Sequence, residues 1–241
     1  MGPNGGDRAD VAVSPVKARE IGAERYLLRA LPKADLDLVM KTGNVLSYQN
    51  RDYLLRQGEN GDGIHIIVTG VVESTYTGLQ GRELMLATWH KGDFVGAPYV
   101  LGEHQHSWSA RALGRVEALH LDQSSIRQLI GLSPAFAIAL IESLGFKGET
   151  YSTLAQTLGG QKVGERLALL LVKLCEHTAQ SSDHSISLGR ITQANLARMI
   201  GATRQSISLV LGRLQEDGVI TAEATTIIVN DIAALKREAG Y

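Results

Sequence analysis

Three side chains suited to reading DNA bases stand near the C-terminus of the chain: Arg204, Gln205 and Ser208. In the major groove of DNA, Arg can pair bidentately with guanine and Gln with adenine. Four apolar residues recur among them at helical spacing and would bury the opposite face: Ile207, Val210, Leu211 and Leu214. The pattern predicts a helix whose N-terminal end presents polar groups to a groove.

A shorter helix is predicted just before it, joined to it through Gly201. Thr192 and Thr203 stand where the two helices begin, and a Thr side chain there can accept a hydrogen bond from a free backbone N–H. Glycine tolerates the positive φ that a sharp turn between helices requires. The apolar face of the shorter helix would consist of Leu196, Ala197 and Ile200. The segment therefore predicts a helix-turn-helix that places its second helix in the major groove. The alternative is a plain helical hairpin with solvated polar ends.

Contacts to the DNA backbone are expected from Thr and Arg residues around the two helices: Thr192, Arg198, Thr203 and Arg213. The whole chain carries a net charge of −1, which provides no general attraction to phosphate. The stretch from Arg190 to Arg213, however, holds four Arg and no acidic residue. Attraction to DNA should therefore be local, and non-specific affinity modest.

The length of 241 residues allows one large domain or two smaller ones. The single cysteine, Cys175, excludes an internal disulfide and a four-cysteine iron–sulfur or zinc site within one chain. It falls in an apolar helical run, which favours a buried apolar residue over a redox sensor. No apolar run approaches the roughly 20 residues of a membrane span, and residues 1–10 lack the apolar stretch of a secretory signal. A cytoplasmic location is the default expectation.

The first half of the chain is predicted to be mainly β. Residues 1–20 are expected to be disordered, and a short helix around 24–41 should follow. Short apolar runs then recur at roughly 8–12-residue spacing, which predicts an antiparallel β-roll or barrel in the domain 21–132. These runs are 45–48, 53–55, 64–68, 71–76, 84–89, 94–95, 108–112 and 116–121.

A long helix is predicted over 133–160, because Ser133 and Pro134 form a good helix start. Residues stepping by four and three form a heptad seam for pairing with a second copy, and the dimer interface is expected to contain Ile141, Leu144, Gly148, Tyr151, Ala155 and Leu158. Gly145 and Gly148 would suit close approach of a partner helix or a local break. A second set would pack on the roll: Phe136, Ile138, Leu140 and Leu154. The alternative is a core helix of a monomer.

The remainder, 161–241, is predicted to be a winged helix-turn-helix domain. A glycine pair, Gly159–Gly160, should end the long helix, and a new helix should run from Val163 to His177. A polar loop over 181–184 precedes the helix-turn-helix. The β-type runs 219–222 and 227–229 predict a wing, and Asp231 is placed as the cap of a last short helix. The fold class is therefore α+β: an N-terminal antiparallel β-roll, a long dimerisation helix and a C-terminal winged helix-turn-helix.

This order of elements resembles the cyclic-AMP receptor protein/FNR family of bacterial transcription regulators over about residues 24–236. The pair Gly58–Glu59 with the run 64–72 resembles the family's cyclic-nucleotide-domain signature, and 92–96 resembles the start of its phosphate-binding cassette. The runs 201–208 and 211–214 resemble its recognition helix. The resemblance implies an effector-responsive homodimer that regulates transcription, not an enzyme. Its expected partners are a palindromic double-stranded operator, a small-molecule effector and RNA polymerase.

Departures from the family pattern bear on the effector and on the operator. Cyclic-AMP binders of this family place a Glu after the cassette glycine and a phosphate-binding Arg about a dozen residues later; here stand Ala97 and the pair His106–Ser107. A buried phosphate without its Arg would be a costly unpaired charge, so cyclic AMP is not expected. In the recognition helix Gln205 replaces a Glu, and Leu209 a later Arg, so the operator should differ from theirs.

A small, partly apolar organic effector fits the remaining residues better, such as an aromatic acid with Arg111 or His106 as counter-charge. The residues expected to line its pocket are Ala97, Pro98, Tyr99, His106, Ser107, Trp108, Arg111, Tyr151 and Ser152. No cofactor is expected. The ligating Cys and His of the family's haem sensors are replaced by Ala97 and Pro98, which leaves haem as an alternative only through other histidines. A cupin-like metal enzyme is the other alternative, with His104 and His106 joined by His90, Glu103 and His120; solvated loop histidines are the simpler interpretation.

Overall fold

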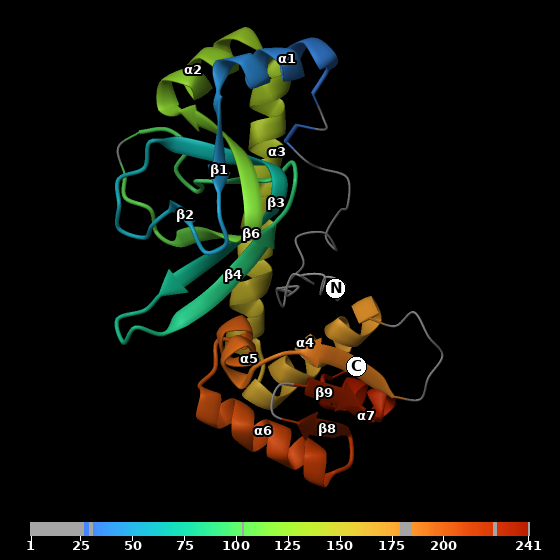
Figure 1. Cartoon of the computed structure of the whole chain (residues 1–241). Helices are drawn as coiled ribbons and strands as arrows, with labels where there is room; N and C mark the ends of the chain where they lie inside the picture. The colour runs from blue at the N-terminus through green and yellow to red at the C-terminus, as the bar shows by residue number, and fades with distance from the viewer. Residues whose placement is uncertain (1–26, 29–30, 103, 179–184, 224–225, 241) are drawn as a thin grey trace, which may run out of the picture. The chain divides into compact units, whose positions relative to one another are not determined.

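The computed structural model describes residues 27–28, 31–102, 104–178, 185–223 and 226–240 (Figure 1). The expected disorder of residues 1–20 and the polar loop 181–184 lie outside these ranges. In chain order the elements are α1 (Lys33–Thr42), β1 (Asn44–Tyr48), β2 (Tyr53–Leu55), β3 (Gly63–Thr77), β4 (Glu83–Trp89), β5 (Phe94–Val95), β6 (Ser109–Asp122), α2 (Gln123–Leu132), α3 (Pro134–Gly160), α4 (Val163–Thr178), β7 (Ile186–Arg190), α5 (Gln193–Ile200), α6 (Arg204–Glu216), β8 (Ile220–Glu223), β9 (Thr226–Val229) and α7 (Ile232–Glu238).

The chain forms two compact units. The first contains the described residues up to Glu73 together with Thr88–Ser143, and the second contains Ser74–Ala87 and the described residues from Leu144 onward. The end of β3, the following turn and most of β4 therefore belong with the C-terminal helices, while the other parts of the sheet, α1 and α2 belong to the first unit.

The predicted roll is a six-stranded sheet with the strand order β1-β6-β3-β4, in which β2 also pairs with β6 and β5 with β3 (Figure 1). The strands β1 and β2 run antiparallel to β6, and β5 runs antiparallel to β3. The centre of the sheet is closely packed, because residues from both of its faces are fully buried: Ile64, Ile66, Ile67, Trp89, Phe94 and Leu119.

The predicted strands were too short at two positions. The runs 64–68 and 71–76 form one strand, β3, and the runs 108–112 and 116–121 form another, β6. The interrupting glycines do not end the strands but give them a local left-handed residue, with φ of 88° at Gly70 and 82° at Gly114. At Gly70 a Cβ atom would lie 2.4 Å from the carbonyl oxygen of Arg115, so only glycine fits where the two strands cross closely.

Two helical predictions need correction in the first unit. The helix expected around 24–41 begins at Lys33 and ends at Thr42, since Pro32 occupies the N-cap position. Helix α2 was not predicted. It begins after Asp122, whose carboxylate accepts a hydrogen bond from the backbone N–H of Ser125 at 2.7 Å. This bond and one from the Ser124 hydroxyl lower the pKa of Asp122 to about 2.

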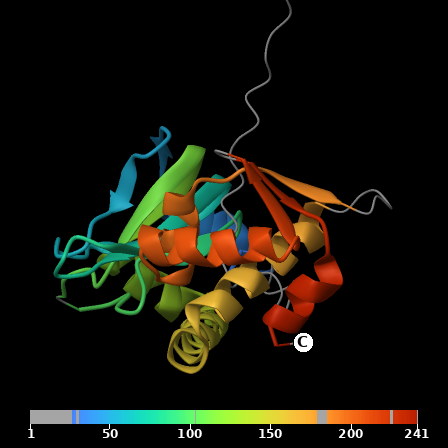
Figure 2. The ribbon, with the colours of Figure 1, turned by 90° about the horizontal axis from the view of Figure 1, so that it is seen from below.

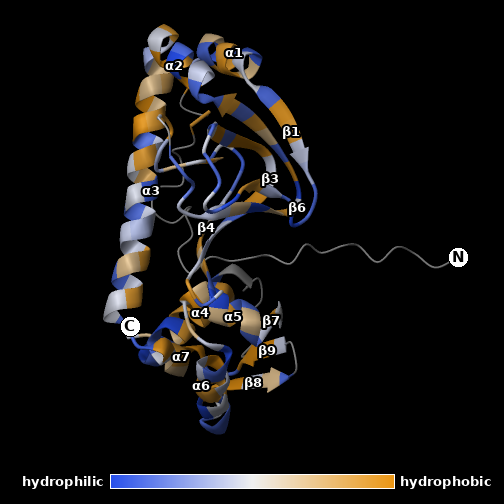
Figure 3. Ribbon diagram, turned by 90° about the vertical axis from the view of Figure 1, so that its left-hand side faces the viewer, coloured by the Kyte–Doolittle hydropathy of each residue, from blue (hydrophilic) through white to orange (hydrophobic). Residues whose placement is uncertain are grey.

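The long helix α3 runs from Pro134 to Gly160 without a break, as predicted. Phe136, Leu140 and Leu154 are buried, as expected for the second apolar set, but Ile138 is 59% exposed and was wrongly placed in it. Ile138 lies two residues from both Phe136 and Leu140, which on a helix turns its side chain away from theirs. Figure 3 shows apolar residues interspersed with hydrophilic ones along the whole helix.

The C-terminal elements form the predicted winged helix-turn-helix (Figures 1 and 2). Helix α4 packs against α7, β7 and the two helices that follow β7. Strands β8 and β9 form the predicted wing, and Asp231 caps α7 by accepting from the N–H of Ala234. Strand β7 was not predicted; it pairs antiparallel with β9 and completes a three-stranded sheet of order β7-β9-β8. No helix of the described residues is long and apolar enough to cross a membrane.

A cluster of histidines lies within the first unit, around the start of β3. The side chain of His65 is buried, and its ring centroid lies 4.6 Å from that of His120 and 6.1 Å from that of Tyr48. Burial lowers the pKa of His65 to about 3, helped by the positive charge that His120 would carry and opposed by Asp62. Burial and the neighbouring His104 also lower the pKa of His106. Both imidazoles are therefore neutral near pH 7.

We expect the stability of the first unit to fall as pH falls below about 6.5, the pKa of His in an unfolded chain. Below that pH the unfolded chain binds a proton at His65 that the folded chain binds only near pH 3. This one residue should cost about 1.4 kcal/mol between pH 7.5 and 5.5. Urea unfolding at the two pH values measures the loss. His65→Phe should reduce it, whereas His90→Asn, a change outside the cluster, should not; equal losses in both variants would contradict the assignment.

Candidate nucleic-acid interface

Local hydrogen bonds define the helix-turn-helix as the sequence predicts. Gly201 has φ 63° and ψ 43°, a left-handed conformation, and a Cβ atom there would lie 2.9 Å from the side chain of Leu158. The Thr192 hydroxyl accepts from the N–H of Asn195 at 3.2 Å. The Thr203 hydroxyl accepts from the N–H of Ser206 at 3.0 Å. Both predicted caps and the predicted turn are confirmed.

The apolar faces of α5 and α6 are buried as predicted. Leu196, Ala197 and Ile200 of α5 are all at most 6% exposed. On α6, Ile207, Leu211 and Leu214 are buried, and Val210 is half-buried. Because this face of α6 is occupied by its own domain, the opposite face is the one available to another molecule.

The three predicted base-reading side chains lie on that available side. Arg204, Gln205 and Ser208 are all exposed in the first turns of α6, and Thr203 beside them is half-buried. The N-terminal end of α6 also carries the positive end of the helix dipole, which favours approach to an anionic backbone. The N-terminal end of α6 thus combines exposed hydrogen-bond donors and acceptors with a positive electrostatic potential that attracts anions.

Two of the arginines predicted to contact phosphate have carboxylate partners in this structure. Arg213 donates to the carboxylate of Glu238 on α7. Arg198 of α5 lies 3.3 Å from the carboxylate of Glu83 on β4, a residue of the same compact unit. Thr192, in contrast, is exposed at the start of α5. Each of these carboxylates competes with a phosphate for its arginine.

The wing is fixed to the end of α6 by side-chain bonds. The Gln215 side-chain oxygen accepts from the N–H of Ala222 at 3.1 Å. The Asn230 amide donates to the Gly218 carbonyl at 3.3 Å and to the Thr221 hydroxyl at 3.0 Å. These bonds hold β8 and β9 in a defined position beside the end of α6. Sequence reasoning did not identify Gln215 or Asn230.

A buried arginine on α4, also missed from the sequence, holds α5 in place. The Nε of Arg166 donates to the carbonyl of Ile200 at 3.0 Å, and its Nη1 donates to the carbonyl of Gln161 at 2.7 Å. Burial lowers the pKa of Arg166, and among the described residues no carboxylate pairs with it. The side chain thus joins the residue after α3 to the end of α5.

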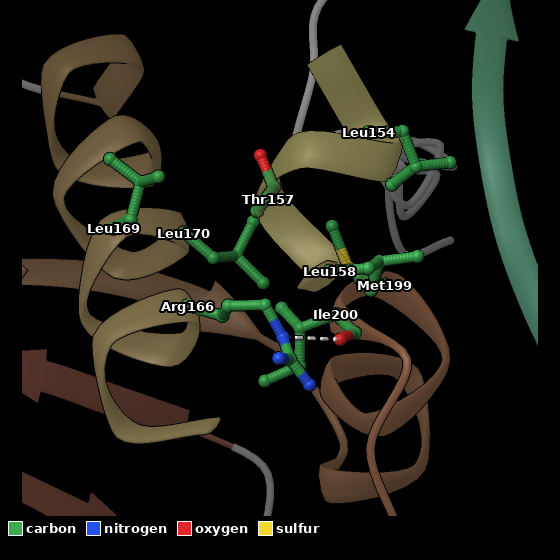
Figure 4. A pocket seen from close by; sticks show the side chains of 8 residues that line it. All are labelled: Leu154, Thr157, Leu158, Arg166, Leu169, Leu170, Met199 and Ile200. Carbon is green, nitrogen blue, oxygen red and sulfur yellow. Dashed lines mark hydrogen bonds between the residues drawn. The ribbon is translucent and has the colours of Figure 1, made fainter. Parts of the chain in front are cut away.

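Around Arg166 lies a shallow hollow of about 260 Å³, part of which is open solvent. Figure 4 shows Arg166 reaching from α4 toward Ile200 on α5 across a lining whose other members are apolar, except for Thr157. The lining residues are Leu154, Thr157, Leu158, Arg166, Leu169, Leu170, Met199 and Ile200. The end of α3, the start of α4 and the end of α5 therefore meet around one guanidinium group.

The residues expected to line the effector pocket are divided between the two compact units. In the first unit, Ala97 and His106 are buried and Trp108 is half-buried, but Pro98 and Ser107 are exposed. Tyr99 is 53% exposed and packs against His104, with ring centroids 5.1 Å apart. The two residues expected from α3, Tyr151 and Ser152, belong to the second unit, where Tyr151 is half-buried and Ser152 exposed; burial raises the pKa of the Tyr151 phenol.

Both predicted counter-charges for an acidic effector, Arg111 and His106, have surroundings that weaken their attraction for an anion. Arg111 donates from its Nε to the carboxylate of Glu73, whose side chain is fully buried on β3. Removing one member of such a pair leaves an uncompensated buried charge, so Arg111 should keep its partner. His106, the other candidate, is neutral because burial lowers its pKa. The pairing of an aromatic acid with Arg111 or His106 stays a prediction. The pair Glu73–Arg111 was not recognised from the sequence.

Two family models match the chain, one on each predicted domain. The cyclic nucleotide-binding domain model matches residues 45–132, and the Crp-like helix-turn-helix domain model matches residues 165–238. The cAMP-activated global transcriptional regulator CRP of Salmonella typhimurium is 24% identical over 202 residues, which cover 82% of this chain and 96% of that protein. This chain belongs to the CRP/FNR family of transcription regulators. Members of the CRP/FNR family regulate transcription and are not enzymes.

Other CRP/FNR relatives are similarly distant. The CRP-like cAMP-activated regulator of Mycobacterium tuberculosis is 22% identical, covering 91% of this chain and 99% of that protein. The c-di-GMP responsive regulator CLP of Xanthomonas campestris has a TM-score of 0.72 at 22% identity, covering 83% of this chain and all of that one. A CooA variant from Carboxydothermus hydrogenoformans has a TM-score of 0.64 at 21% identity, covering 83% of this chain and 89% of that one. These structures confirm the predicted fold.

The cysteine and the loop histidines of this CRP/FNR chain have ordinary structural surroundings. Cys175 is buried, and burial raises the pKa of its thiol to about 11, in agreement with the predicted apolar role. The Nδ1 of His104 donates to the carbonyl of Gly102, 2.8 Å away, and the His104 ring centroid lies 5.9 Å from that of His106. Within the described ranges, which omit Glu103, no three His, Cys, Asp or Glu side chains are grouped to hold a metal ion.

Substituting Arg166 should show how strongly this CRP/FNR domain depends on it. Arg166→Leu leaves two carbonyls without their donors, which should lower the free energy of unfolding by about 2–4 kcal/mol. Arg166→Lys keeps the charge and one donor, so its loss should be smaller. Chemical denaturation followed by far-UV circular dichroism measures both variants. If Arg166→Leu were as stable as the wild type, the proposed role of the two bonds would be wrong.

Proposed function

We propose that this CRP/FNR-family protein is a homodimer that binds a palindromic DNA site in response to a small organic effector. Each subunit places α6 in one of two successive major grooves, so half-site centres lie about 10 base pairs apart. Arg204, Gln205 and Ser208 read base edges. Thr192 and Thr203 contact the backbone, and Arg198 and Arg213 join them after leaving their carboxylate partners.

The observation that carries this proposal is the exposed N-terminal face of α6. Three polar side chains suited to base edges stand together there, at the end of a helix whose other face is buried. Exposed Arg and Gln side chains alone are common on protein surfaces. Here they occupy the recognition helix of a domain that matches the Crp-like helix-turn-helix model.

The exposed residues of α3 support the dimer. Ile141 is 67% exposed, and Leu144 and Tyr151 are half-buried along the predicted seam. Gly148 is exposed, and a Cβ atom there would meet nothing within 4 Å in the described chain. A glycine within a helix costs about 1 kcal/mol relative to alanine. Close approach of a second α3 explains why a glycine stands at position 148, whereas no contact within the described part of the single chain explains it.

The effector proposed is a small organic molecule without a strongly acidic group. Ala97 and His106 stand where cyclic-AMP binders need a Glu and an Arg, and Glu73 already compensates the charge of Arg111. The relatives named above respond to different effectors, cAMP for CRP and c-di-GMP for CLP, so the fold alone does not specify the ligand. Effector binding would shift a balance between two arrangements of the DNA-binding domains. RNA polymerase is the further partner that this function requires.

DNA binding is tested by selecting sites from a random duplex pool with the full-length protein, with and without a small-molecule cell extract. We expect an inverted repeat to be enriched. Arg204→Ala should weaken binding to that repeat by about 1–3 kcal/mol per half-site, because it removes one bidentate base contact. Gel retardation measures the affinity.

Arg237→Ala serves as the control, since it removes the same charge from α7. It should retain the wild-type preference for the repeat over a scrambled probe. Equal affinities of wild type and Arg204→Ala for the repeat would refute the assignment of α6 as the reader.

The dimer seam is tested with two neighbouring exposed residues of α3. Ala155 lies on the predicted seam, whereas Gln156 lies beside it, and both are exposed in the single chain. Ala155→Glu places a carboxylate on each side of the twofold seam, so the protein should become monomeric and lose binding to the repeat. Gln156→Glu should remain dimeric. Analytical ultracentrifugation distinguishes the two, and two dimers of equal affinity would contradict the seam.

A further inference from the structure

A leucine stands exposed in the middle of the outward face of α6. Leu209 is 71% exposed, although it belongs to a helix whose other large apolar residues are buried or half-buried. A residue turns about 100° around a helix axis relative to its neighbour. Leu209 is therefore about 160° from both Ile207 and Leu211 and faces away from the domain. It lies four residues after Gln205, one turn further along the same side.

A second feature of the same face points to contact with another molecule. Gly212 follows Leu209 by three residues, is exposed, and would have no atom within 4 Å of an added Cβ in the described chain. A glycine inside a helix lowers helix stability, and nothing in the chain requires it here. Close approach of another molecule at Gly212 accounts for it, and a partner that close would also cover Leu209.

The chemistry of the major groove limits what Leu209 can recognise there. Base edges in the groove carry donors and acceptors, and the thymine C5-methyl is the apolar group among them. A leucine offers no hydrogen bond, so a G·C or C·G pair facing it would lose water without compensation. A thymine methyl, in contrast, would gain an apolar contact.

We infer that Leu209 is a specificity-determining residue that packs against a thymine methyl in each half-site. The inference rests on the proposed function of α6. Four residues of helix rise span about 6 Å, and base pairs are spaced about 3.4 Å apart. The A·T pair recognised by Leu209 should therefore lie within about two base pairs of the one that Gln205 reads.

The test removes the methyl group without changing base pairing. In the selected inverted repeat, the thymines of each half-site are replaced one position at a time, symmetrically, by uracil. At one position the wild-type protein should bind the uracil probe about fourfold more weakly per half-site than the thymine probe. This factor corresponds to the loss of one buried methyl group, about 0.8 kcal/mol. Leu209→Ala should bind the thymine and uracil probes with equal affinity.

The control variant is Leu79→Ala, which removes another exposed leucine outside the recognition helix. It should keep the full difference between thymine and uracil. A specific site whose thymine methyls are all dispensable, or a methyl effect that persists in Leu209→Ala, would overturn this inference alone. A pool from which no sequence is enriched would overturn the proposed function and the inference with it.

Discussion

The burial of one face of α6 determines what the rest of this molecule can do. Ile207, Leu211 and Leu214 are in the core of the C-terminal domain, so the helix cannot rotate without exposing them. Full burial of each such side chain is worth about 1.5–3 kcal/mol, more than any single polar contact on the outer face can offset. The outward position of Arg204 and Gln205 is thus a consequence of core packing. No contact of their own is needed to turn these two side chains outward.

The position of α5 is held by its buried apolar face and, in addition, by polar bonds to distant elements. Arg166 bonds the carbonyl at the end of α5 and the carbonyl of Gln161, which follows α3. Arg198 bonds α5 to Glu83 at the start of β4. Both arginines lie within one compact unit, together with the turn between β3 and β4. A change at the end of α3 or at the start of β4 would therefore reach the helix-turn-helix through these two side chains and through Leu158 and Leu84, which lie beside Gly201.

Local features of this chain were predictable from the sequence because they depend on neighbouring residues. The caps at Thr192 and Thr203, the turn at Gly201 and the ends of α3 all follow from the preferences of single residues for particular backbone conformations. Helical periodicity alone predicted which face of α6 is exposed.

Features that depend on distant residues were not predictable. Glu73 and Arg111 are 38 positions apart and meet only because β6 lies beside β3 in the sheet. The same applies to Arg198 with Glu83 and to Arg166 with Ile200. The predicted runs stop before Gly70 and Gly114, but both glycines adopt a left-handed conformation inside one continuous strand, and Gly70 also allows a close approach to Arg115. Strand β7 is short and depends on pairing with β9, which follows it by more than thirty residues.

The central claim, that the outer face of α6 reads DNA sequence, is tested most directly by changing what one side chain can recognise. Site selection with Gln205→Glu, compared with the wild type, replaces a side chain that pairs with adenine by one that accepts from cytosine. The account predicts that the enriched inverted repeat changes at one base pair in each half-site, symmetrically, while the other positions are retained. Identical preferred sequences for the two proteins would contradict it.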